Sequence, residues 1–342
     1  MGLFRYPAGF YVQMLDRMLY RMFSNSTAFY SKSDQQDYRN FQCLSTVNLI
    51  FVFLTVTICV MSALATFMNA LLIRLLYQSK ILHPNVRLLL KSLAIAVFLG
   101  SLFMFLKFTL YHPFLILVGF QRMLIKSTIC ALIELPFHVC SLALILSITG
   151  IGIERFSATI KQKSDSEKPG RGTKTILIGI WLVAFGNIIA GYLYAYANQT
   201  IMCYCHLSLV TTQRIFAVNT MFYVFIEISV LFLFWYVYYR NCKDYCNFTI
   251  NTARHNLHAR FQMINNVETT RTLLPVVVVH ALFWTAYLLS LTFVRNFLDI
   301  KQQAMLKINC MLAVYHLLPL EMLIQPLLIV RRSEHLKKVA LE

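Results

Sequence analysis

Residues 130–156 read CALIELPFHVCSLALILSITGIGIERF, and this stretch decides how the rest of the chain is interpreted. Glu134 is its only charged residue before the Glu154-Arg155 pair near its end, so it is long and apolar enough to cross a bilayer as a helix. Arg155 follows Cys130 by 25 residues, which corresponds to about 37 Å along a helix. We therefore predict one helix with a cysteine at one membrane face and an arginine at the other.

The composition indicates that lipid is the solvent for most of the chain. Of its 342 residues, 58% are hydrophobic and only 13% are charged, with a mean hydropathy of +0.62. Soluble domains usually contain about 25% charged residues. The net charge of +17 does not indicate nucleic-acid binding, because the basic residues alternate with apolar segments and do not form one face. Nine cysteines lack the spacing of a zinc site, so we predict no metal and no cofactor.

Seven apolar segments separated by polar, basic loops predict seven transmembrane helices. The sequence also predicts a loop at 111–124 and a long polar loop at about 240–271. Lys107 is interpreted as a lysine at a helix end whose ammonium reaches the membrane surface. The expected spans are 46–73, 86–110, 130–156, 175–197, 215–239, 272–294 and 305–330.

These spans define three regions and an orientation. The chain is predicted to be an all-α, seven-transmembrane helix bundle at 46–330, with an extracellular tail at 1–45 and a basic cytoplasmic tail at 331–342. With the N-terminus outside, nineteen of the 31 Lys and Arg lie in the inner loops and C-terminal tail, and seven lie in the outer loops. Because basic residues concentrate in cytoplasmic loops, this orientation is favoured.

The same orientation predicts glycosylation and a disulfide. Sequons at Asn25 and Asn198 would lie outside, where they can be modified, although chance explains the Asn25 sequon equally well. Cys130, Cys203 and Cys205 would also face the oxidising side. We expect a bridge from Cys130 to either Cys203 or Cys205, which would hold the second outer loop over the bundle.

At the other end of the same helix, Glu154, Arg155 and Phe156 form a candidate coupling site. An arginine at the membrane edge is often only an interface anchor. Glu154 gives a second interpretation, since it can pair with Arg155 in one state and release it to an intracellular partner in another. A partner that prefers one of two packings shifts their populations.

Ionisable and aromatic residues inside the spans indicate a ligand pocket between spans three, five, six and seven. Buried ionisable residues in a bundle are costly and are usually functional or paired. Glu134 and His138 lie one turn apart and would form the polar end of the pocket. Hydrogen bonding between helices is the alternative role for each. The candidate ligand-binding residues are Glu134, Phe137, His138, Glu227, Trp284, Tyr287, Tyr315 and His316.

The arrangement resembles that of G-protein-coupled receptors. It shares seven spans, an outer cysteine 25 residues before an inner Glu-Arg-aromatic sequence, a cysteine in the second outer loop, and Trp181 in span four. It departs from the rhodopsin-like class in several places. Span two has no acid at residues 93–97, no proline follows Trp284, and span seven reads Gln325-Pro326-Leu327 in place of Asn-Pro-x-x-Tyr.

Two segments carry a narrower resemblance. Residues 154–159, ERFSAT, are similar to the ER-x-x-AT signature of nematode serpentine chemoreceptors. Residues 255–267, HNLHARFQMINNV, resemble their L-x-x-R-Y/F-Q-x-x-E-N segment, with Asn265 where glutamate is frequent. The resemblance is to the Sra-type superfamily, with class alpha-beta or epsilon nearest. It implies a small-molecule chemical cue as ligand, a heterotrimeric G protein as partner, and a place in the plasma membrane, in sensory neurons the ciliary membrane.

Two other functions can be weighed against a receptor. A seven-span transporter would show internal repeats, and none is visible, although Pro319 and Pro326 interrupt span seven. A ligand-gated channel of the insect-receptor type would have its N-terminus inside, against the charge distribution. Enzymes are disfavoured because HExxH, Gly-x-Ser-x-Gly and phosphate-loop motifs are absent from the sequence.

Overall fold

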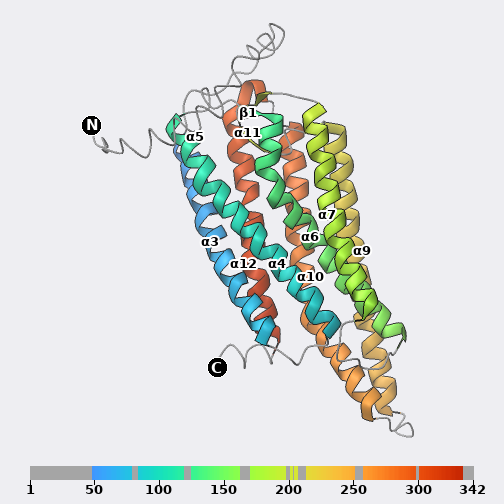
Figure 1. Ribbon diagram of the computed structural model, residues 1–342. Coiled ribbons are helices and arrows are strands. Elements are labelled where there is room, and N and C mark those ends of the chain that lie inside the picture. Colours follow the sequence, from blue (N-terminus) through green and yellow to red (C-terminus); the bar gives the residue numbers. More distant parts are fainter. Residues whose placement is uncertain are drawn as a thin grey trace. The chain divides into compact units, whose positions relative to one another are not determined.

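The structure is a computed structural model of the chain (Figure 1). The chain divides into two units, Met1–Cys43 and Leu44–Glu342. The structure describes residues 48–78, 84–118, 125–161, 170–197, 201–202, 204–206, 213–250, 257–297 and 300–333, all in the second unit. The expected glycosylation sites Asn25 and Asn198, and also Cys203, lie outside the described residues.

Seven helical segments of the described part are long and apolar enough to cross a membrane. This confirms the prediction of an all-α, seven-transmembrane bundle. Two short strands, β1 (Ile125–Lys126) and β2 (Ile201–Met202), pair antiparallel at one end of the bundle. The helices are α3 (Leu49–Gln78), α4 (Pro84–Leu106) continued by η2 (Lys107–Tyr111) and α5 (His112–Val118), α6 (Ser127–Lys161), α7 (Arg171–Ala197), α9 (Gln213–Ile250), α10 (Leu257–Phe297), and α11 (Ile300–Tyr315) followed by α12 (Leu317–Arg332).

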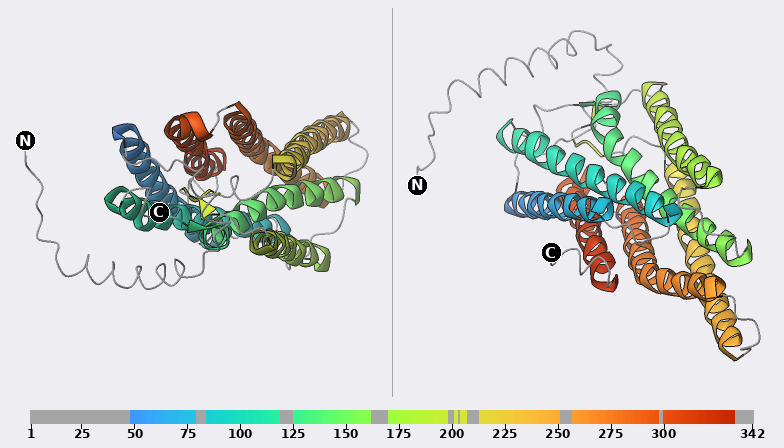
Figure 2. Two further views of the ribbon diagram at one scale, coloured as in Figure 1. Left: turned by 90° about the horizontal axis from the view of Figure 1, so that it is seen from above. Right: turned by 60° about the horizontal axis from the view of Figure 1, so that its bottom comes forward.

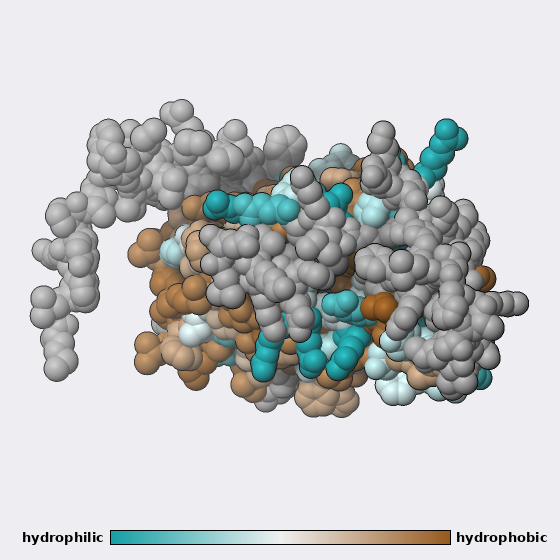
Figure 3. All heavy atoms as spheres, turned by 90° about the horizontal axis from the view of Figure 1, so that it is seen from below, coloured by the Kyte–Doolittle hydropathy of each residue, from teal (hydrophilic) through white to brown (hydrophobic). Residues whose placement is uncertain are grey.

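Helix α3 shows how the sequence separates a lipid-facing surface from a bundle-facing one. Its buried residues recur every three to four positions, which places them on one helical face. Phe53 and Phe67, on the opposite face, are more than 60% exposed, as expected where lipid is the solvent. Seen from below, hydrophobic side chains gather at the left and lower edges of the bundle, and hydrophilic ones lie nearer the middle (Figure 3).

Helix α6, which contains residues 130–156, lies at the centre of the packing. It contacts α4, α7, α9 and α10. Seen from above, α3, α12, α10 and α9 follow one another along one side of the bundle, and α4, α6 and α7 lie along the other (Figure 2). Direct contacts between α3 and α4 and between α9 and α6 connect the two sides.

Two glycines let other helices approach α6 closely. A Cβ at Gly150 would lie 3.1 Å from the side chains of Ile176 and Ile180 on α7. A Cβ at Gly152 would lie 3.1 Å from side-chain carbons of Leu233 and Phe234 on α9. Small residues at such contacts are the usual way for membrane helices to pack tightly.

The loops predicted at 111–124 and at about 240–271 are both wrong in part. Span two continues as a helix to Val118. Helix α9 continues to Ile250 and helix α10 begins at Leu257, so both reach beyond the other helices (Figure 1). Helix α5 (HPFLILV) is apolar and continues span two, whereas the added turns of α9 and α10 are rich in polar residues, so hydropathy does not detect them. Local pairs support them instead, such as Arg240 and Asp244, whose Nε and Oδ2 are 3.2 Å apart.

Span seven is divided at His316, which lies between the end of α11 at Tyr315 and the start of α12 at Leu317. Pro319 explains the position of the break. A proline has no backbone N–H to donate to the carbonyl four residues earlier, here that of Tyr315, and its ring clashes with that carbonyl. Pro326, by contrast, lies within the continuous helix α12.

Candidate functional site

A disulfide joins Cys130 on α6 to Cys205 in the loop after α7, with the Cα atoms 5.2 Å apart. The predicted bridge is confirmed, and Cys205, not Cys203, is the partner of Cys130. The β1–β2 pair and a hydrogen bond from Ser127 Oγ to the carbonyl of Ala195 hold the same region. The loop is therefore fixed to the bundle at several points.

Side chains next to the disulfide seat the loop in the bundle. The backbone N–H of Cys205 donates to Tyr111 Oη at 3.1 Å, and the Tyr204 hydroxyl lies 3.3 Å from His112 Nε2. The His206 ring packs edge-on against Tyr315, with ring centroids 5.2 Å apart. Burial raises the pKa of Tyr204 and lowers the pKa of His206 to about 3. His206 is therefore neutral at neutral pH.

Glu134 is held by a buried cluster near the loop. Its carboxylate forms an ion pair with Lys107 and accepts a hydrogen bond from the Tyr315 hydroxyl at 3.4 Å. His138 Nε2 lies 3.8 Å from the Glu134 carboxylate, beyond hydrogen-bonding distance. The interpretation of Lys107 as a lysine at the membrane surface is wrong, because its side chain is only 5% exposed. The π-helical turn that begins at Lys107 interrupts the regular α-helix at this position.

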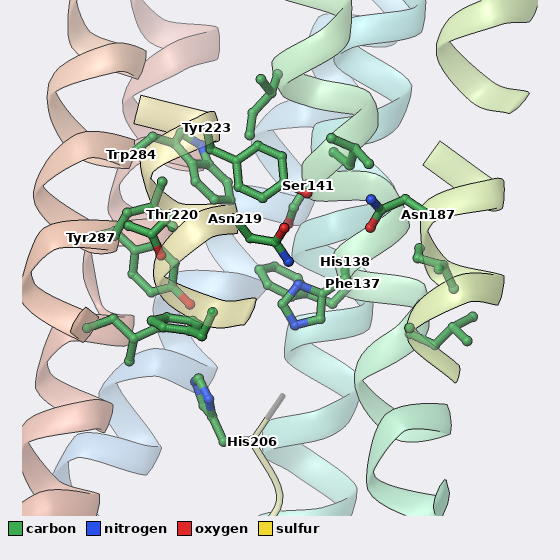
Figure 4. A pocket seen from close by; sticks show the side chains of 18 of the residues that line it. Phe137, His138, Ser141, Asn187, His206, Asn219, Thr220, Tyr223, Trp284 and Tyr287 are labelled. Atoms are coloured by element: carbon green, nitrogen blue, oxygen red, sulfur yellow. The ribbon is translucent and has the colours of Figure 1, made fainter. Parts of the chain in front are cut away.

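A cavity of about 150 Å³ lies next to this cluster, between α6, α7, α9 and α10 (Figure 4). Its lining is mostly aliphatic and aromatic. The polar members are His138, Ser141, Asn187, His206, Asn219 and Thr220. A concave, mostly apolar pocket with a few polar groups is the usual form of a small-molecule site.

The cavity includes half of the residues predicted to bind a ligand. Phe137, His138, Trp284 and Tyr287 line it. The other four do not, and each has a structural partner. Glu134 and Tyr315 bond to each other, Glu227 bonds to His280, and His316 bonds to Thr57 on α3. The prediction also placed span seven (α11 and α12) in the pocket wall, whereas the lining includes residues of helix α7, which is the fourth span.

A second buried cluster joins three helices away from the cavity. His280 on α10 contacts Glu227 on α9 through Nε2 and Glu321 on α12 through Nδ1, each at 3.1 Å. Glu227 was singled out from the sequence, but His280 was missed. The only available signal was a polar histidine inside a span without charged residues. Among the described residues, no group of three or more His, Cys, Asp and Glu side chains is arranged to hold a metal.

At the opposite end of α6 from the disulfide, Glu154 and Arg155 form the ion pair that the sequence suggested. Arg155 Nε and Nη2 both lie 2.6 Å from Glu154 Oε2. Arg155 Nη1 also donates to Asn266 Oδ1 on α10 at 3.1 Å, and Asn85 Nδ2 on α4 donates to Glu154 Oε1 at 3.2 Å. These contacts connect α6 with α4 and α10, and Arg155 is only 2% exposed. The neighbouring Phe156 ring packs against Tyr236 on α9.

Comparison with known proteins agrees with this architecture. A model of the family described as serpentine type 7TM GPCR receptor class ab chemoreceptor matches residues 33–341. This chain belongs to that family. The receptor is also 27% identical over 245 residues to serpentine receptor class alpha/beta-14 of Caenorhabditis elegans. The aligned region covers 70% of this chain and 60% of the relative. The resemblance to nematode serpentine chemoreceptors is confirmed, and the receptor is a multi-pass membrane protein of a chemosensory, G-protein-coupled-receptor-like family.

Proposed function

We propose that this serpentine receptor binds a small chemical cue in the cavity and activates a heterotrimeric G protein at the end of the bundle that carries Arg155. In this proposal the N-terminus and the Cys130–Cys205 disulfide face outward, and the C-terminus is cytoplasmic. The receptor acts in the plasma membrane, and in sensory neurons it acts in the membrane of the cilium. The charge distribution of the loops supports this orientation.

The observation that carries the proposal is that the same two helices form both sites. His138 on α6 and Trp284 on α10 line the cavity, and Arg155 on α6 bonds Asn266 on α10 at the opposite end. A ligand between α6 and α10 that favours one spacing of these helices must shift the equilibrium of the Arg155–Asn266 contact. Arg155 is buried in this structure, so its release would present a guanidinium that the closed bundle conceals.

Substituting the arginine tests the coupling. We expect Arg155→Ala to lose most G-protein activation, measured as guanine-nucleotide exchange in membranes, while surface expression stays normal. Lys174→Ala is the matched control, because it removes one positive charge from an exposed site at the start of α7. Full activation by Arg155→Ala would show that the proposed coupling site is wrong.

Glycosylation mapping tests the orientation independently. Asn25 and Asn198 should carry N-linked glycans that an endoglycosidase removes, whereas the sequon at Asn247 should stay unmodified. A glycan on Asn247 would reverse the topology and place Arg155 outside the cell. That result would contradict the receptor mechanism, whatever the outcome of the Arg155→Ala experiment.

A further inference from the structure

We propose that the cavity selects a small, electrically neutral and largely apolar molecule that carries one hydrogen-bond acceptor, such as a ketone or an ester. This inference rests on the proposed function, because it takes the cavity as the ligand site. Three properties of the cavity carry it: its size, the absence of charged residues from its lining, and a set of polar atoms without partners.

The size of the cavity restricts the ligand to a compact molecule. Its volume is about 150 Å³, comparable to an engineered protein cavity that holds one benzene molecule. The disulfide-bonded loop covers this end of the bundle, where His206 forms part of the lining. A peptide or an oligosaccharide does not fit such a volume.

The charge of the lining favours a neutral ligand. No Asp, Glu, Lys or Arg is found among the described residues that line the cavity. Glu134, whose carboxylate lies 3.8 Å from His138 in the lining, already forms an ion pair with Lys107, and His206 is neutral at neutral pH because burial lowers its pKa. An ionic ligand would lose its hydration without gaining a counter-charge, which is strongly unfavourable.

Three polar atoms of the lining indicate the position of an acceptor. His138 Nε2, Ser141 Oγ and Trp284 Nε1 are shielded from solvent and have no hydrogen-bond partner within the described part of the chain. Buried polar atoms are nearly always paired in native proteins. His138 and Ser141 lie three residues apart on α6, so they share a face, and Trp284 lies on α10 (Figure 4). The indole N–H can only donate, so its missing partner must be an acceptor.

Binding of matched probes to the purified receptor in lipid nanodiscs tests the proposal. Cyclohexanone supplies the acceptor, methylcyclohexane lacks it, and cyclohexylammonium and benzoate carry opposite charges on rings of similar size. Saturation-transfer NMR titrations should show cyclohexanone binding most tightly, with both charged probes at least about tenfold weaker. Equal binding of either charged probe would overturn the proposal, and so would the absence of cyclohexanone binding.

Variants locate the hydrogen bond. Trp284→Phe keeps an aromatic ring and removes the donor, so cyclohexanone affinity should fall about tenfold while methylcyclohexane affinity changes less than about twofold. Trp235→Phe is the control, because Trp235 is 65% exposed on the lipid side of α9. Ser141→Ala provides a second test with the same selectivity if Trp284→Phe does not fold. Equal losses for both probes would show that the polar atoms play no part.

These outcomes are separable from the proposed function. Binding is measured without a G protein, and coupling is measured through Arg155→Ala without an identified ligand. If the probe experiment fails but Arg155→Ala loses G-protein activation as expected, the ligand class is rejected and the receptor mechanism is kept. The reverse result would keep the ligand site and reject the coupling site.

Discussion

The two ends of α6 are held in different ways. Near Cys130 a disulfide, a two-stranded pairing and the buried Lys107–Glu134 ion pair fix the helix to its neighbours. Near Arg155, polar contacts with Glu154, Asn85 and Asn266 hold it instead. At the first end a covalent bond and a buried ion pair link α6 to other elements, whereas at the second end the Glu154–Arg155 pair lies within α6 and single hydrogen bonds link it to α4 and α10. The first end is therefore suited to hold a ligand site in shape, and the second to change state.

The buried ion pair at the first end should show the largest effect. Lys107→Met leaves the Glu134 carboxylate without its cation in a site that is 0% exposed, and we expect a loss of about 3–5 kcal/mol in the free energy of unfolding. Thermal denaturation in nanodiscs measures it. The double variant Lys107→Met/Glu134→Gln should recover much of the loss, because the unpaired charge is removed.

A matched lysine gives the control for this prediction. Lys91 lies with its ammonium 3.8 Å from the centre of the Tyr77 ring, and Lys91→Met should cost less than about 1 kcal/mol. If Lys107→Met were as stable as the natural protein, the first end of α6 would not be the rigid one.

Removing the disulfide should have the next largest effect. The double variant Cys130→Ser/Cys205→Ser leaves no unpaired thiol from the bridge and should lower stability by about 2–4 kcal/mol, since the bond closes a loop across 75 residues. Cys59→Ser, at a free and half-buried cysteine, should change stability much less. Intact binding of cyclohexanone by the double variant would mean that the loop does not shape the cavity.

Much of this contrast was visible in the sequence, and its limits have physical causes. Hydropathy finds spans because each needs about twenty apolar residues, and it places Cys130 and Arg155 at opposite ends of one helix. It does not report which face of a helix meets a neighbour. For that reason the sequence did not reveal that α7 lines the cavity. For the same reason Glu134 was predicted to contact a ligand, whereas its carboxylate pairs with Lys107.

Lys107 and His280 show two further limits. A lysine near the end of an apolar window normally marks the membrane surface, but a π-helical turn and a buried acid keep Lys107 inside. His280 carries no formal charge in a sequence count, so its position between Glu227 and Glu321 could not be detected. Both depend on contacts between residues far apart in the chain.

Protonation of His206, next to the disulfide, should make stability depend on pH, with an effect of intermediate size. The pKa of His206 is lowered to about 3, mainly by burial; Glu134 raises it, and Lys107, His138 and Arg295 lower it. Because the pKa in the folded state lies below that of an unfolded histidine, the unfolded chain takes up the proton first as the pH falls. The contribution is constant above about pH 6.5 and should fall by about 2 kcal/mol by pH 5.

A variant isolates this contribution from the other titrating groups. His206→Phe can still pack against Tyr315 but cannot take up a proton. Denaturation curves at pH 7 and pH 5 should therefore differ less for His206→Phe than for the natural protein. Equal differences would show that protons reach His206 in the folded receptor, and that the loop is looser than the structure indicates.

The smallest effect is expected at the second end, where a change in population matters more than a change in stability. Asn266→Ala removes the acceptor that α10 offers to Arg155, and one such hydrogen bond is worth about 1 kcal/mol. The released state should become about fivefold more populated, which raises nucleotide exchange without ligand by a similar factor. Asn266→Asp supplies a charged acceptor and should lower it instead. A change in the same direction for both variants would mean that packing of α10, and not its contact with the arginine, sets the resting state. The two ends of α6 would then differ in strength but not in role.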